Sequence, residues 1–161
     1  MLSAVDFVSL QAFMDVLPED RLAVISIGDP AQLPPSQFYG HAHALRLEFL
    51  DNELEDLAIH GIPAEALCSL EQVESAVHFI RELHASPQSY RLVVHCRMGA
   101  SRSAAIALVA HSMTQCHFPR WAEANYANKH VLLLAQDILG IQIAVPPFPY
   151  DYDYLPSALA I

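Results

Sequence analysis

The chain has 161 residues, of which 53% are hydrophobic and 16% are charged, a composition typical of one folded domain, residues 1–161. Its formal net charge is −10, because 18 acidic residues stand against 8 basic ones, and this excludes a broad basic surface. We therefore expect neither nucleic acids nor anionic membranes as partners, and any bound anion must be held by a few groups at one place.

The first part of the chain predicts a helix and two strands. Apolar spacing before Pro18 is compatible with a short helix, and an apolar, β-branched run ending in Gly-Asp-Pro predicts a buried strand that leads into a turn. A proline-rich loop and an alternating second strand follow. The elements expected here are a helix at 5–17, a strand at 22–27, a loop at 31–40, a strand at 44–49 and an acidic loop with a helical turn at 51–60.

The second part predicts more helix. Ser69 and Gln72 fit a capping box, and apolar residues at helical spacing follow them. The alternation of strands and helices indicates an α/β fold, with a central, mostly parallel sheet flanked by helices on both faces. The elements expected here are a helix at 70–84, a strand at 91–95, an apolar central helix at 101–113, a helix starting at Pro119, a last helix ending near Gly140, and a tail rich in Pro, Tyr and Asp at 145–161.

Cysteine use and the N-terminus indicate the compartment. Cys68, Cys96 and Cys116 are too few and too scattered for a disulfide framework. The N-terminal residues lack the positive segment and cleavage site of a signal peptide, and the apolar stretches fall short of the roughly 18 residues that span a membrane. We expect a cytoplasmic protein, in which a reactive thiol stays reduced.

The segment His-Cys-Arg-Met-Gly-Ala-Ser-Arg-Ser, residues 95–103 and called the signature loop below, carries the chemistry. A sharp turn from strand to helix directs backbone N–H groups and the positive end of the helix dipole at a bound phosphate. The same field favours a thiolate at Cys96, which can attack phosphorus, while Gly99 supplies backbone freedom and Arg102 can hold two phosphate oxygens. The expected phosphate-binding residues are Arg97, Met98, Gly99, Ala100, Ser101 and Arg102.

The signature loop matches the HCx5R(S/T) motif of cysteine-based protein tyrosine phosphatases and most resembles their dual-specificity branch. The segments ISIGDP, RLEFLD and NKHVLLLAQDILG also resemble small bacterial tyrosine-phosphatase-like proteins. The resemblance implies a tyrosine-phosphatase-like fold and a phosphocysteine intermediate on Cys96, with Arg102 binding the phosphoryl group. It also implies that Ser103 helps the thiolate leave, that His95 holds the loop in shape, and that neither a metal nor an organic cofactor is needed.

A phosphatase of this kind also needs an acid that protonates the leaving group. In the family this residue is an aspartate upstream of the cysteine, directly after a strand, and Asp51 occupies that place. Asp56 is the second candidate, and Glu53 and Glu55 stay open as well. Each of these four carboxylates could equally belong to a solvated acidic turn.

Two further features allow more than one interpretation. Cys68 could protect Cys96 by forming a reversible disulfide, but a lone cysteine near a helix start is more often a small core residue. The tail at 145–161 could dock on a partner or fold back on the domain.

The predicted function is a phosphatase that acts on phosphorylated proteins, on phosphotyrosine and, with a shallow pocket, on phosphoserine and phosphothreonine. One alternative is a phosphatase for a phosphoinositide or an RNA 5'-phosphate, although such enzymes tend to carry more basic residues near the loop than Arg97. Another is a module that recognises phosphate with little turnover. A sulfur transferase also uses a loop cysteine before a helix, but Arg102 followed by Ser103 favours phosphate.

Overall fold

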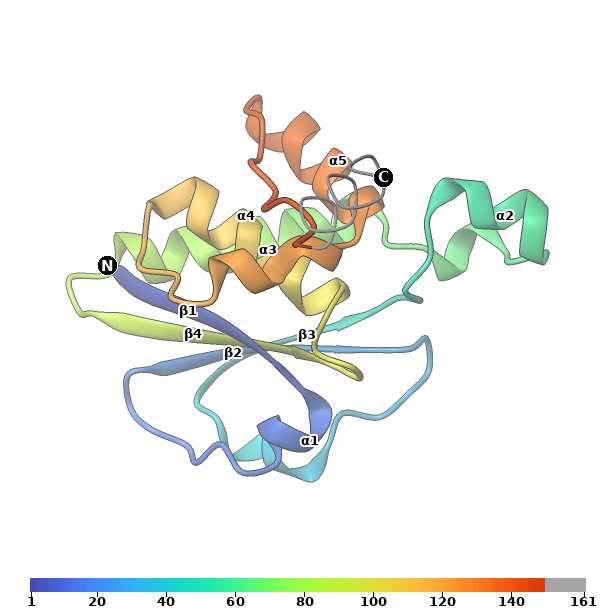
Figure 1. Cartoon of the computed structure of the whole chain (residues 1–161). Coiled ribbons are helices and arrows are strands. Elements are labelled where there is room, and N and C mark those ends of the chain that lie inside the picture. Colours follow the sequence, from blue (N-terminus) through green and yellow to red (C-terminus); the bar gives the residue numbers. More distant parts are fainter. Residues whose placement is uncertain (150–161) are drawn as a thin grey trace, which may run out of the picture.

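A computed structural model describes residues 1–149 of the chain. In this part of the chain, four parallel strands form one sheet in the order β1-β4-β2-β3 (Figure 1). All seven residues of β2 are buried, as expected for an interior strand that is covered on both faces. The strands are β1 (Leu2–Ser9), β2 (Leu22–Gly28), β3 (His43–Glu48) and β4 (Tyr90–Cys96).

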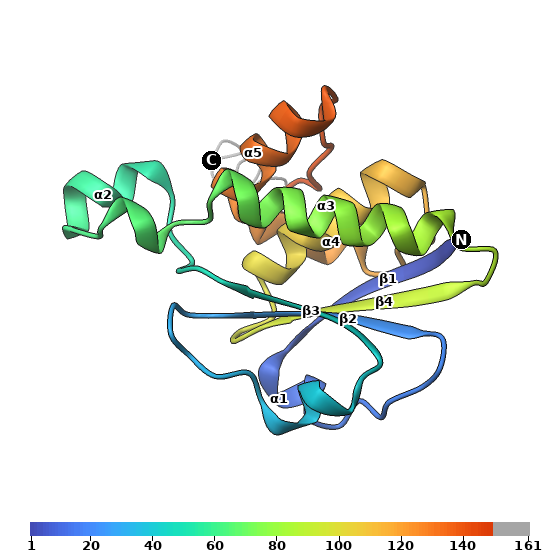
Figure 2. The ribbon, with the colours of Figure 1, turned by 180° about the vertical axis from the view of Figure 1, so that it is seen from behind.

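Helices lie on both faces of this sheet (Figures 1 and 2). α3 and α4 cover one face, and α5 packs against these two helices. The short α1 and the 3-10 helix η1 lie on the other face. The predicted α/β class, with a parallel sheet between helices, is confirmed. The helices are α1 (Leu10–Phe13), η1 (Ser36–Gly40), α2 (Leu54–His60), η2 (Ala64–Ala66), α3 (Leu70–Ala85), α4 (Arg102–Thr114), η3 (Trp121–Tyr126) and α5 (Lys129–Leu139).

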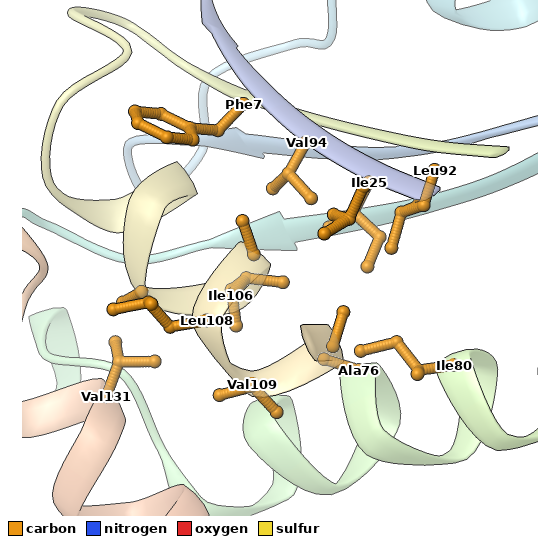
Figure 3. Packing of buried hydrophobic residues seen from close by; sticks show 14 of the residues in the cluster. Phe7, Ile25, Ala76, Ile80, Leu92, Val94, Ile106, Leu108, Val109 and Val131 are labelled. Atoms are coloured by element: carbon orange, nitrogen blue, oxygen red, sulfur yellow. The ribbon is translucent and has the colours of Figure 1, made fainter. Parts of the chain in front are cut away.

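α4 is the central helix of the core. Its first nine residues, 102–110, are all buried, which confirms the central position expected from its apolar sequence. Ile106 lies toward the sheet and Val109 toward α3, so α4 is enclosed between the two layers (Figure 3). The N-terminus of this helix is therefore fixed in place at the end of β4.

Local signals set the ends of the neighbouring helices. Ser69 and Gln72 form the predicted capping box at the start of α3, and Asn128 caps α5 by accepting a hydrogen bond from the Val131 amide. Gly140 ends α5 in the left-handed conformation, with φ at 64°. Both predicted ends of α3 and the predicted end of α5 near Gly140 are confirmed to within about a residue.

The helix predicted at 5–17 is wrong for most of its length. Residues 2–9 form β1, which pairs with β4, and only Leu10–Phe13 are helical. Val5 and Phe7 are buried while Asp6 is half-exposed, so the segment alternates as a strand does. Val8 is also apolar and α1 follows directly, so the apolar residues from Val5 to Phe13 imitate the spacing of a helix.

Smaller differences lie in the connections. The loop predicted at 31–40 ends in η1, and the segment that starts after Pro119 is the 3-10 helix η3 rather than an α-helix. Residues 150–161, most of the predicted tail, lie outside the described residues. No helix within residues 1–149 has the length and apolar character required to cross a membrane.

Candidate active site

The signature loop turns from β4 into α4 at the carboxyl end of the sheet (Figure 1). Gly99 lies at its tip with φ at 68°, and a Cβ atom there would lie 2.3 Å from the Ser9 amide nitrogen. The Leu10 amide donates to the Arg97 carbonyl at 3.2 Å. The loop is thus packed against the junction of β1 and α1, and only glycine fits at its closest approach.

The amides of this loop are available to an anion. In the described part of the chain, the N–H groups of residues 97–101 donate no hydrogen bond. They precede the 13-residue α4, whose dipole adds positive potential at the same place. Arg97 and Met98 are exposed, whereas Gly99, Ala100 and Ser101 are half-buried. The loop therefore offers donors that a phosphate group could occupy.

Cys96 and Ser103 form a buried pair below the loop. The Cys96 side chain is the last of β4 and is 2% exposed, and Ser103 in the first turn of α4 is fully buried. The Cys96 Sγ and Ser103 Oγ atoms are 3.1 Å apart. In this arrangement the hydroxyl can donate a hydrogen bond to a thiolate.

Arg102 is held by two acceptors that leave half of its guanidinium free. Its Nη1 donates to Asp29 Oδ1 and to the Phe49 carbonyl, both at 2.8 Å. Nε and Nη2 have no partner among the described residues, although Arg102 as a whole is only 5% exposed. These two donors form the side of a guanidinium that binds two oxygens of one phosphate group.

Asp29 is a site residue that sequence reasoning missed. It directly follows β2, the neighbour of β4, and parallel strands bring their carboxyl ends to one edge of the sheet. Its place between Gly28 and Pro30 identified it only as part of a turn. Its position directly after β2 could have identified it, but only with the knowledge that β2 and β4 are adjacent in the sheet.

Asp51 also lies at the signature loop. Its Oδ1 accepts hydrogen bonds from Ser101 Oγ at 2.6 Å and from Asn128 Nδ2 at 3.0 Å. Asn128 is 3% exposed, and its amide donates to the Ser101 carbonyl at 3.2 Å. A buried asparagine thus joins the carboxylate of Asp51 to the end of the loop. Sequence reasoning also missed Asn128, because an asparagine directly before a helix is an ordinary N-cap residue.

The other acidic candidates are occupied elsewhere. Asp56 accepts from the Glu53 amide at 2.8 Å in the capping box of α2, and this hydrogen bond is the main cause that lowers the pKa of Asp56. Glu53 accepts from the Lys129 amide at 3.3 Å. Glu55 is exposed and makes no hydrogen bond with the loop in residues 1–149. Of the four carboxylates considered, Asp51 alone contacts the signature loop within the described chain.

His95 points to the opposite face of the sheet from Cys96. It is 1% exposed, and neither ring nitrogen has a partner of hydrogen-bond geometry among the described residues. Its ring stacks on Phe13 at 4.2 Å between centroids, and Phe13 also contacts the ring of His41. Burial, reinforced by the charge of Arg46, lowers the pKa of His95 to about 4. The structure therefore gives His95 a packing contact with α1, and no side-chain hydrogen bond to the loop.

The remaining cysteines are buried thiols. Burial raises the pKa of Cys68 to about 12, and burial also raises the pKa of Cys116. All three cysteines are free in the structure. A thiol that resists ionisation is a poor partner in disulfide exchange, which favours the core interpretation of Cys68.

Comparison with known proteins adds little to this geometry. No family model matches the chain, and no curated protein matches its sequence. A solved structure, that of human tyrosine phosphatase-like serine/threonine/tyrosine-interacting protein, is similar over 84% of this chain and 80% of its own. The sequence identity is 16% and the TM-score is 0.31. A likeness of this size does not establish a shared fold or activity.

Proposed function

We propose that the protein is a cysteine-dependent phosphatase that hydrolyses phosphate monoesters of phosphorylated proteins, with phosphotyrosine as the main substrate. The observation that carries the proposal is the composition of one short segment. Residues 96–102 combine a buried cysteine, five unpaired amides and the free side of the Arg102 guanidinium. A nucleophile beside a rigid set of anion donors is the arrangement that phosphoryl transfer requires.

The first step forms the covalent intermediate. The Cys96 thiolate attacks phosphorus, and an S–P bond forms as the bond from phosphorus to the ester oxygen breaks. The Asp51 carboxyl group gives its proton to the departing oxygen, which leaves as an alcohol or phenol. Arg102 and the loop amides bind the phosphoryl oxygens, whose charge they neutralise in the transition state.

The second step hydrolyses the phosphocysteine and regenerates the free enzyme. Water attacks phosphorus, the S–P bond breaks, and the Asp51 carboxylate accepts the proton that the water loses. The hydroxyl of Ser103, 3.1 Å from Sγ, donates a hydrogen bond to the departing thiolate. Inorganic phosphate leaves, and Asp51 is protonated for the next cycle. No step uses a metal or an organic cofactor.

The test is hydrolysis of para-nitrophenyl phosphate with EDTA present, between about pH 4.5 and 8. We expect the wild-type protein to be active and Cys96→Ser to be inactive. Cys116→Ser is the matched control, because it removes a second buried thiol that follows the opposite end of α4 from the signature loop, and it should retain activity.

Phosphopeptides and other phosphate esters define the substrate class in the same assay. A phosphotyrosine peptide should be a better substrate than a phosphoinositide or an RNA 5'-phosphate. A folded, reduced protein that binds a phosphotyrosine peptide but turns over none of these compounds would instead be a phosphate-recognising module.

A further inference from the structure

A cavity lined by both polar and apolar side chains lies next to the candidate active site, on the face of the sheet that carries α1. It has a volume of about 100 Å³, and its lining includes Arg46 of β3, His95 of β4 and Arg97 of the signature loop, with Leu10 and Leu33. Arg46 and His95 point to the same face, because both pair with Ser26 of β2 in the parallel register. The cavity thus shares His95 and Arg97 with the signature loop, whereas Arg46 belongs to β3.

Buried nitrogens without partners belong to the residues that line the cavity, and those that can donate are Nε of Arg46 and one nitrogen of the neutral His95 ring. Neither ring nitrogen of His95 has a hydrogen bond within residues 1–149, and the same holds for Nε of Arg46. The other two nitrogens of Arg46 are fixed, because Nη1 donates to Ser26 Oγ at 2.7 Å and Nη2 to the Gln32 carbonyl at 2.8 Å. A buried donor left unpaired is costly, so a ligand that accepts hydrogen bonds would be stabilised here.

Positive charge is concentrated at this place. The chain has only 8 lysines and arginines, yet Arg46 and Arg97 line the cavity and the charge of Arg102 acts on Arg46. Burial is the main cause that lowers the pKa of Arg46; Glu48, Tyr39 and Asp29 act in the opposite direction, and Arg102 lowers it slightly further. Two of the seven arginines of a protein whose net charge is −10 thus line one small cavity, with Arg102 near enough to act on Arg46.

We infer that this cavity, called the Arg46 subsite below, binds a second oxyanion next to the phosphate that the signature loop holds. The inference rests on the proposed function and deepens it, because it defines the substrate as a phosphate ester with an acidic group beside it. A volume near 100 Å³ has room for about three water molecules, which suits one carboxylate or phosphate group. In a phosphoprotein this group is the side chain of an acidic residue next to the phosphorylated one.

The test uses inorganic phosphate as the probe and the Cys96→Ser protein, so that activity plays no part. Phosphate is added at constant ionic strength while NMR follows the amides of residues 97–101, the Gln32 side-chain amide and the His95 ring. We expect two sets of shift changes with different affinities, one for the loop and one for the Arg46 subsite. Sodium chloride at equal ionic strength should produce neither.

Three variants test whether the second set of NMR shift changes arises from the Arg46 subsite. Arg46→Gln should weaken the changes at Gln32 and His95 about tenfold or more, since one charged hydrogen-bond donor is lost, and the loop changes should persist. Arg97→Gln, which alters an exposed side chain and spares the core, should weaken the same set. Arg91→Gln is the matched control, because Arg91 lies on β4, the strand of His95, but pairs with Glu19 at the surface.

The source of the oxyanion is decided with two phosphotyrosine peptides that differ in one neighbouring residue, Asp in one and Asn in the other. If the substrate supplies the group, the wild-type protein prefers the Asp peptide about tenfold in kcat/KM, and Arg46→Gln loses this preference. Equal kcat/KM values, with phosphate still bound in the cavity, would overturn the substrate assignment and leave a site for free phosphate.

The two proposals fail in different ways. Absence of any change at Gln32 and His95, at phosphate concentrations that saturate the loop, would overturn the Arg46 subsite. A response at the Arg46 subsite in a protein whose wild-type form hydrolyses no phosphate ester would overturn the proposed function instead.

Discussion

Arg102 Nη1 donates a hydrogen bond to Asp29 Oδ1 at 2.8 Å, and this pair joins the end of β2 to the start of α4. The Arg102 side chain is 6% exposed and that of Asp29 is 40% exposed, so a nearly buried cation is compensated by a carboxylate at the rim. One edge of the guanidinium is therefore oriented before any ligand binds. In the proposed mechanism Asp29 acts through Arg102, as a positioning residue.

Substitution of Asp29 should lower activity by disturbing this orientation. Asp29→Asn keeps an acceptor but removes the charge, and we expect kcat/KM to fall roughly tenfold; Asp29→Ala removes both and should cost up to about a hundredfold. Steady-state kinetics with para-nitrophenyl phosphate measure the change. Glu19→Gln, which breaks the exposed pair with Arg91, is the control and should have wild-type kinetics. Wild-type activity in Asp29→Ala would contradict the positioning role.

Asp51 should behave as the general acid. Asp51→Asn is expected to lower kcat by roughly 10²- to 10⁴-fold for an alkyl phosphate, and by less for a substrate with a good leaving group. Asp56→Asn is the control, since it removes a cap of α2 without touching the loop. The assignment is wrong if Asp56→Asn loses activity and Asp51→Asn does not.

Gly99 should tolerate no side chain. Gly99→Ala places a methyl group within 2.3 to 2.7 Å of backbone atoms of Val8 and Ser9, so the loop must move and activity should be lost. Gly61→Ala is a matched control, because Gly61 has a similar φ of 63° and nothing within 4 Å of the added carbon. We expect Gly61→Ala to cost about 1 kcal/mol of unfolding free energy, and Gly99→Ala about 1 to 3 kcal/mol more. Thermal unfolding and kinetics check both, and equal effects of the two variants would contradict the packing argument.

Buried His95 should make stability depend on pH. Its pKa is lowered from 6.5 to about 4 in the folded protein. As pH falls from 6.5 toward 4, the unfolded chain takes up a proton at His95 that the folded protein does not, so the free energy of unfolding falls across this window. Above pH 6.5 the group has no effect. The loss should reach about 2 kcal/mol near pH 5.

Urea unfolding at about pH 7 and pH 5 measures this effect. Wild type and His95→Gln are compared, because the acidic residues and His41 contribute to both proteins and cancel in the difference. The variant should lose less stability between the two pH values than the wild type does. An identical loss in both proteins would show that His95 is not buried in its neutral form.

Much of the fold could be predicted because its signals are local. The apolar run of β2, the capping box at Ser69 and Gln72, and the buried sequence of α4 each specify one element without reference to the rest of the chain. β1 was misjudged because its identity depends on pairing with β4, about 90 residues away. Apolar residues on both sides of this strand, Phe7 and Val8, and the direct continuation into α1 hide the period of two that would distinguish it from a helix.

The same distinction between local and long-range signals applies to the residues of the candidate site. Cys96, Arg102 and Ser103 lie on one segment, so spacing alone could predict that they act together. Asp29 and Asn128 come close to the loop only through the strand order and the packing of α5 on α4, which no local pattern encodes. The expected role of His95 in holding the loop remains a prediction, because its ring packs on Phe13 rather than on the loop.

The central claim is that Cys96 carries the phosphoryl group during turnover, and trapping of that intermediate tests it most directly. The protein is mixed with para-nitrophenyl phosphate and quenched within one turnover, and its peptides are then analysed by mass spectrometry under conditions that preserve S–P bonds. Ser103→Ala serves as the trapping variant, since loss of the hydroxyl 3.1 Å from Sγ should slow the second step. We predict that the peptide containing Cys96 gains the mass of one phosphoryl group, and that this gain is absent in Cys96→Ser. Product formation at the normal rate with no phosphorylated Cys96 peptide would contradict the mechanism.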